Sequence, residues 1–142
     1  MHNSIRLLPS LLLIRCVISL LLLSPPALGD VGTAASYAPP YLPTACYGSD
    51  EGQFPANSLF AAAGDAIWDN GACCGRQYLV RCLSSATPGA CTEGEVQVTV
   101  VDYAASLASG PSAAGTTLVL PSSAFAMIAQ PSVSQINIEF TP

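Results

Sequence analysis

Five of the six cysteines of this 142-residue chain lie in its middle, at positions 46, 73, 74, 82 and 91, and the sixth, Cys16, lies in the N-terminal leader described below. A small domain in an oxidising compartment gains stability when disulfides close such loops. The number is odd, so at most two bridges and one free thiol can form, and spacing alone leaves several pairings open. Cys73 and Cys74 are adjacent, and a bond between them would be strained. A thiolate zinc site is the alternative, but paired CxxC units are missing. We therefore expect a disulfide-stabilised domain.

The first 29 residues have the pattern of a secretory signal peptide. Arg6 precedes an apolar stretch at residues 17–23, and the small-residue pattern Ala27-Leu28-Gly29 follows. Arg15 interrupts the apolar residues, which argues against a membrane span. We expect cleavage after Gly29 and secretion to the extracellular space, without membrane insertion. One small domain, residues 30–142, is then left.

Removal of this leader sharpens the charge of the chain. Only Arg76 and Arg81 remain against nine acidic residues, a net charge of −7, and neither lysine nor histidine is left. Two arginines cannot form a basic surface for nucleic acid, so no nucleic-acid partner is expected. Mechanisms that need a histidine base or a histidine-ligated zinc are excluded as well. We expect no metal and no cofactor.

Alternating apolar and polar residues at 96–100 and 136–140, a β-branched and apolar run at 116–120 and two further segments predict short strands. We expect strands at residues 31–37, 77–82, 96–100, 116–120 and 136–140. Short helices are expected at residues 58–67, where Asn57 can cap the first turn, and at residues 122–130. Asp69-Asn70-Gly71 is a strong turn signal. Many short strands with two small helices indicate a compact, mainly β barrel.

Several local motifs follow one another in a specific order. They are Tyr37-Ala38-Pro39-Pro40-Tyr41, Ala45-Cys46-Tyr47-Gly48, Trp68-Asp69-Asn70-Gly71-Ala72-Cys73-Cys74-Gly75-Arg76, Val80-Arg81-Cys82, Cys91-Thr92-Glu93-Gly94, Val100-Val101-Asp102 and Ser123-Ala124-Phe125. The ordered set resembles the plant natriuretic peptide-like proteins, which are single-domain relatives of expansins in the barwin-like superfamily. The resemblance implies a six-stranded double-psi β-barrel with one or two short helices and the bridges Cys46–Cys74 and Cys82–Cys91.

Cys73 is the cysteine that this framework leaves over. Relatives usually carry another residue before the Cys-Gly-Arg motif. Cys73 is then either an incidental small apolar residue or a free thiol that forms an intermolecular disulfide. We expect a monomer, in which the first interpretation holds.

The resemblance also suggests where a ligand groove would lie. Asp102 matches the acidic residue that ends the Val-Asp strand of the family, and Tyr37 matches the tyrosine of its first strand. The second acid of the expansin groove falls at Val119. A glycosidase needs two carboxyl groups about 5–9.5 Å apart. Only Glu93 and Glu95 offer a second one by proximity in sequence, so we expect no enzyme.

Three residues are therefore candidates for the ligand groove: Asp102, Tyr37 and Trp68. Asp102 either contacts a ligand or accepts backbone N–H groups that hold a turn. Trp68, which precedes a turn, either anchors that turn against the core or stacks on a sugar. Tyr37 either packs against the barrel or adds to an amphipathic surface.

Three functions from different classes remain open. The resemblance implies a secreted apoplastic protein that signals in water and ion homeostasis and in the stress response, with a plasma-membrane receptor as its partner. The alternative is a non-hydrolytic module that binds or loosens cell-wall polysaccharide. The third is a vestigial lytic enzyme centred on Asp102.

Overall fold

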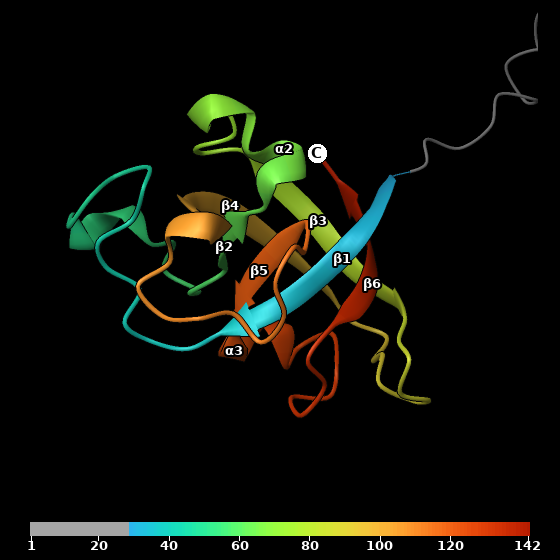
Figure 1. Cartoon of the computed structure of the whole chain (residues 1–142). Coiled ribbons are helices and arrows are strands. Elements are labelled where there is room, and N and C mark those ends of the chain that lie inside the picture. The colour runs from blue at the N-terminus through green and yellow to red at the C-terminus, as the bar shows by residue number, and fades with distance from the viewer. Residues whose placement is uncertain (1–28) are drawn as a thin grey trace, which may run out of the picture.

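Six strands close into a barrel (Figure 1). The structure is a computed structural model, and it describes residues 29–142. The predicted signal peptide lies outside the described residues, apart from Gly29. The strands are β1 (Asp30–Tyr37), β2 (Phe60–Ala63), β3 (Gln77–Ser84), β4 (Glu95–Tyr103), β5 (Leu118–Pro121) and β6 (Ile136–Thr141).

The strands follow one another around the barrel in the order β1-β5-β2-β4-β3-β6. β1 pairs in parallel with β5, and β2 pairs in parallel with β4. The other neighbours are antiparallel. The five predicted strands are thus confirmed, with ends that differ by a few residues, and β2 is a sixth that the pattern did not reveal.

The prediction of a helix at residues 58–67 is wrong over most of its length. Phe60–Ala63 is strand β2, and all four residues are buried. The Asn57 Oδ1 atom accepts a hydrogen bond from the Leu59 N–H, as a helix cap would, but the chain then runs into the barrel. Alanine has high helix propensity, but the narrow space between β4 and β5 favours a strand of small residues.

The helical segments of the described chain are all short. They are α2 (Asp65–Trp68), α3 (Ser122–Phe125) and the 3₁₀ turns at Glu51–Gln53, Asp69–Gly71 and Ala104–Ser106. The helix expected at residues 122–130 therefore ends early, and single hydrogen-bonded turns follow it. None of the helices in residues 29–142 is long and apolar enough to cross a membrane. The turn signal at residues 69–71 is confirmed, because Asp69 and Asn70 both have positive φ.

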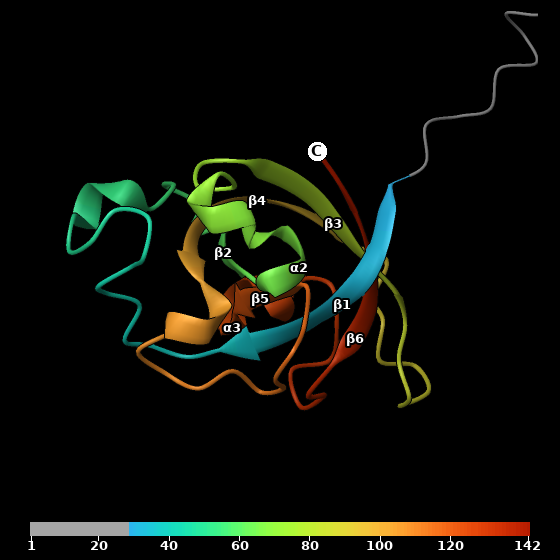
Figure 2. The ribbon, with the colours of Figure 1, turned by 45° about the horizontal axis from the view of Figure 1, so that its top comes forward.

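The main hydrophobic core fills the barrel interior. Its largest fully buried side chains include Phe125, Leu118, Leu120, Ile128, Ile136 and Ile138. Phe125 of α3 belongs to this core, and Ile67 and Trp68 of α2 pack against it. The two helices lie at opposite ends of the barrel in Figure 1, and α2 covers the end that faces the viewer in Figure 2. A second, smaller cluster lies outside this core. It consists of Ala35, Tyr37, Phe60, Ala62, Val101 and Val119. We call it the outer cluster.

Both disulfides implied by the resemblance are present, Cys46–Cys74 and Cys82–Cys91. Cys73 bonds to no cysteine of the described chain and is fully buried in the main core. Burial raises the pKa of its thiol, which therefore stays protonated and unreactive. An intermolecular disulfide would require this part of the core to open, so the position favours the small apolar role.

Candidate functional site

A β-bulge in β4 decides which way Asp102 points. Ala61 of β2 pairs with Val100, but the next residue, Ala62, pairs with Asp102, so Val101 is an extra residue. Val100 belongs to the main core, whereas Val101 and Ala62 belong to the outer cluster. Asp102 therefore shares the outer face with Ala62.

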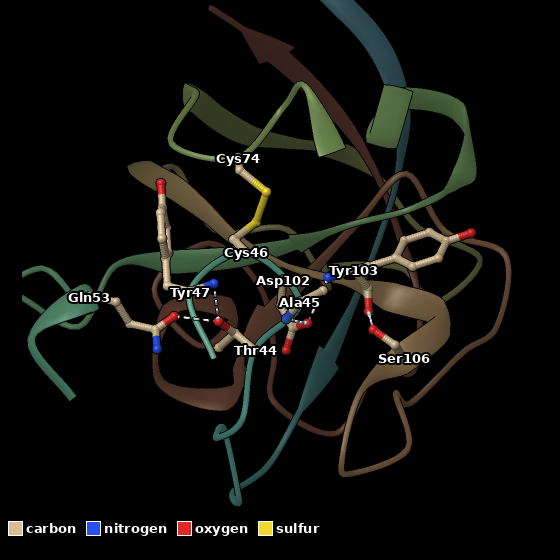
Figure 3. Close-up of a disulfide and its surroundings, with 9 residues drawn as sticks. All are labelled: Thr44, Ala45, Cys46, Tyr47, Gln53, Cys74, Asp102, Tyr103 and Ser106. Atoms are coloured by element: carbon tan, nitrogen blue, oxygen red, sulfur yellow. Dashed lines mark hydrogen bonds between the residues drawn. A yellow bond between two sulfur atoms is a disulfide. The ribbon is translucent and has the colours of Figure 1, made fainter. Parts of the chain in front are cut away.

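The Asp102 carboxylate is held through one of its two oxygens (Figure 3). Its Oδ1 atom accepts hydrogen bonds from the N–H groups of Ala45 at 2.9 Å and Tyr103 at 2.8 Å. The residue is only 2% exposed. The Oδ2 atom accepts no hydrogen bond from residues 29–142. No fully buried side-chain oxygen or nitrogen of these residues lacks a hydrogen-bond partner, so Oδ2 keeps some contact with solvent. The role of Asp102 as an acceptor for backbone N–H groups thus involves Oδ1 only, and Oδ2 can accept a hydrogen bond from a ligand.

The hydrogen bond from the Ala45 N–H to the Asp102 carboxylate attaches the loop before β2 to β4. The N–H of the next residue, Cys46, donates to the Val101 carbonyl at 3.2 Å. The Cys46–Cys74 bridge ties the same point to a neighbouring turn, whose Gly75 N–H donates to the Val100 carbonyl at 2.9 Å. Figure 3 shows the bridge and the carboxylate on either side of this attachment. The wall of the site is therefore rigid beside Asp102.

Tyr37 ends β1 on the same outer face. Its ring meets the ring of Tyr41 edge-to-face, with centroids 5.0 Å apart, and Tyr41 meets Phe60 in the same way at 5.1 Å. The Tyr37 hydroxyl has no hydrogen-bond partner in the described chain, and it is not enclosed. Burial, together with the nearby charge of Asp102, raises the pKa of Tyr37. Its hydroxyl therefore stays protonated and can donate a hydrogen bond at any physiological pH.

Trp68 contacts Tyr103, the residue that follows Asp102 in β4. It is half-buried against the main core and stacks on the ring of Tyr103, with centroids 4.5 Å apart and planes 17° from parallel. Tyr103 directly follows Asp102 in β4, and its hydroxyl donates a hydrogen bond to the Asp65 carboxylate. The packing favours the anchor interpretation of Trp68, while its use as a sugar platform stays a prediction.

No acid suggested by the sequence stands opposite Asp102. Val119 is 1% exposed and forms part of the apolar outer cluster, between Ala35 and Ala62. Glu95 begins β4, about 23 Å of extended chain away from Asp102. Glu93 lines a separate small cleft with Glu95. Neither glutamate comes within the separation that glycoside hydrolysis needs.

Asp65 is a carboxylate that the sequence analysis did not single out. It begins α2 and meets Tyr103, from which it is 38 residues distant in the chain. No local motif marks it, because the contact depends on how β2 and β4 pair.

The pH dependence of stability offers a test of the Asp102 environment. Burial raises the pKa of Asp102 from 3.8, against the opposing effect of the two backbone N–H groups. The folded state thus holds the proton more tightly than the unfolded chain, and this stabilisation is full below pH 3.8 and lost as the pH rises through the folded pKa. We expect the wild type to lose stability relative to Asp102→Asn over that window. Urea unfolding of both proteins at several pH values measures it, and a constant difference would contradict the expectation.

Comparisons with a family model and with individual proteins place the chain among related proteins. A family model described as lytic transglycolase matches residues 60–140, more than half of the chain. An EG45-like domain containing protein of Citrus jambhiri is 36% identical over 132 residues, which cover 90% of this chain and 92% of that protein. Putative EG45-like domain containing protein 1 of Arabidopsis thaliana is 40% identical over 102 residues, which cover 70% of this chain and 74% of that protein.

Solved structures confirm the expected double-psi β-barrel fold. The apo expansin of Clavibacter michiganensis superposes with a TM-score of 0.54 at 20% identity. A variant of that expansin in complex with cellohexaose superposes with a TM-score of 0.53 at 21% identity. Each match covers 78% of this chain but 48% of the expansin chain, so this chain spans about half of the expansin's length.

Proposed function

The chain belongs to the EG45-like domain proteins of the expansin-like double-psi β-barrel family, and from this premise we propose that it is a non-hydrolytic module that binds neutral cell-wall polysaccharide. The proposed binding site is the outer face that carries Asp102 and Tyr37. The proposal includes secretion to the apoplast as a single barrel domain, residues 30–142, because the predicted signal peptide and two disulfides suit an extracellular protein.

The observation that carries this proposal is the pair of polar atoms left open on the outer face. Asp102 Oδ2 can accept a hydrogen bond and Tyr37 Oη can donate one, and neither has a partner in residues 29–142. Sugar hydroxyl groups need both kinds of partner. The apolar side chains of the outer cluster lie around the two atoms, as is usual in a site for a neutral ligand.

The lack of a paired acid supports binding without hydrolysis. Hydrolysis of a glycosidic bond normally uses two carboxyl groups about 5–9.5 Å apart. Val119 occupies the position of the second acid on the outer face, and Glu95 lies at the other end of β4. The proposal therefore excludes hydrolysis by a pair of acids on the outer face, and the sugar-release comparison below tests the activity named in the family model.

Charge supports a neutral ligand over an acidic one. Residues 30–142 carry nine acids and two arginines. Pectin, a polymer of uronic acids, would be repelled by this net charge. The expansin solved with cellohexaose shares the fold, and it supports a neutral glucan as the first ligand to test.

Titration with cellohexaose tests the proposal. We expect the wild type to bind and Asp102→Asn to bind roughly ten-fold more weakly, because the amide that replaces one oxygen loses the charge and an acceptor. Glu93→Gln, which changes the charge equally in the loop before β4, is expected to bind as the wild type does. The wild type should release no more soluble sugar from wall glucan than Asp102→Asn does. Absence of binding, or release that depends on Asp102, would overturn the proposal.

Signalling through a plasma-membrane receptor stays a prediction. The relatives are named for their domain alone, and the described residues offer no feature that points to a receptor rather than to a glycan. The expansin complex with cellohexaose favours the polysaccharide.

A further inference from the structure

A cleft of about 580 Å³ continues from the outer cluster along the side of the barrel. It shares Ala104, Ala113 and Val119 with the outer cluster and its packed neighbours. Small side chains line most of it, and its volume falls within the range of ligand pockets. The cleft therefore adjoins the outer cluster at Val119.

The two walls of the cleft meet at Gly64. The Gly64 N–H donates to the Thr117 carbonyl at 2.8 Å, and a Cβ on Gly64 would lie 2.0 Å from the Thr116 carbonyl oxygen. Only glycine allows the walls to approach this closely. α2 begins at the next residue, so the position of Asp65 is set directly by this contact.

Asp65 is the only carboxylate among the described residues that line the cleft. Its Oδ1 atom accepts the hydrogen bond from the Tyr103 hydroxyl, and Trp68 holds the Tyr103 ring by stacking. One oxygen of Asp65 is thus used to fix the side chain, and the second is left for another donor. In Asp102, likewise, one oxygen accepts hydrogen bonds and the other has no partner in residues 29–142.

We propose that Asp65 is the second glycan-contacting carboxylate of this protein, placed in the cleft beyond Val119, where it binds hydroxyl groups of a linear neutral glucan. This inference rests on the proposed function, and it deepens it by naming a longer ligand and a specificity-determining residue. Tyr103 and Trp68 are positioning residues, because they hold Asp65 in place. The acid missing at Val119 is in this way replaced from α2, a different part of the chain.

Trp68 is the only tryptophan of the chain and stacks on the residue that holds Asp65, so its fluorescence reports on the cleft. We expect cellohexaose to change Trp68 emission with saturation in the wild type. Asp65→Asn should bind cellohexaose roughly five-fold more weakly. Tyr103→Phe keeps the ring stack but removes the hydroxyl, and it should weaken binding by a smaller factor. Asp69→Asn is the matched control, because Asp69 is exposed, pairs loosely with Arg76 at 3.8 Å and has a positive φ that asparagine tolerates.

A comparison of short and long glucans tests the role of Asp65 separately from that of Asp102. Cellobiose, which is too short to reach from Asp102 into the cleft, should bind weakly and equally well to the wild type and Asp65→Asn. Equal binding of cellohexaose by the wild type and a folded Asp65→Asn protein would overturn the inference and leave the proposed function intact. If the wild type binds no cellohexaose, the proposed function fails first. Circular dichroism of each variant shows that it is folded.

Discussion

Removal of the Cys46–Cys74 disulfide is expected to lower the free energy of unfolding more than any other change considered for this protein. The bridge spans 28 residues, and loop-closure entropy predicts a loss of about 3.6 kcal/mol for the double variant Cys46→Ala/Cys74→Ala. Both cysteines are replaced because a single replacement would leave a thiol at position 74 beside Cys73. Urea unfolding at pH 7 measures the loss.

The second disulfide is the matched control for the first. Cys82–Cys91 spans nine residues, and the same relation predicts a loss of about 2.6 kcal/mol for Cys82→Ala/Cys91→Ala. The Cys46–Cys74 variant should therefore be the less stable of the two by about 1 kcal/mol. Equal stabilities, or the reverse order, would show that loop length does not determine the contribution of these bridges.

Replacement of Asp102 by alanine is expected to lower the free energy of unfolding by about 2–3 kcal/mol at neutral pH. The backbone N–H groups of Ala45 and Tyr103 both lose their acceptor, and the loop anchored at Ala45 loses an attachment to β4. Relief from burying a charge offsets part of this loss, since burial raises the pKa of Asp102. Urea unfolding and amide hydrogen exchange at Ala45 measure the two effects.

Asp102→Asn separates the structural role of the residue from its role toward a ligand. The asparagine oxygen can accept both backbone hydrogen bonds, so we expect stability close to that of the wild type and protection of the Ala45 amide. Its binding of cellohexaose should still fall. If the asparagine variant were as unstable as the alanine variant, the charge of Asp102 rather than its hydrogen bonds would hold the loop.

Much of the barrel could be predicted from the sequence because local pattern and burial agree there. In β4, Val96, Val98 and Val100 alternate with polar residues and face the main core of the barrel. The two disulfides followed from the resemblance to a known framework. β2 could not be predicted, since its three consecutive alanines suit a helix by propensity, and only their position between β4 and β5 makes them part of a strand.

The candidate site was predictable only in part. Asp102 and Tyr37 were singled out and lie on one face, where burial and, to a smaller extent, the charge of Asp102 raise the pKa of Tyr37. Trp68 is joined to them by Tyr103. Asp65 carried no signal, because its contact with Tyr103 bridges 38 residues.

The sequence by itself determined five of the six strands, the five cysteines that the resemblance arranges into two bridges, and the carboxylate near the end of β4. The direction of that carboxylate was decided only by the tertiary structure. Strict alternation after Val96, Val98 and Val100 would turn Asp102 into the main core, where an unpaired charge is costly. The bulge at Val101 inserts one residue and reverses the alternation, so Asp102 faces the outer cluster. A bulge arises from pairing with β2, which is distant in sequence, and no periodicity within β4 reveals it.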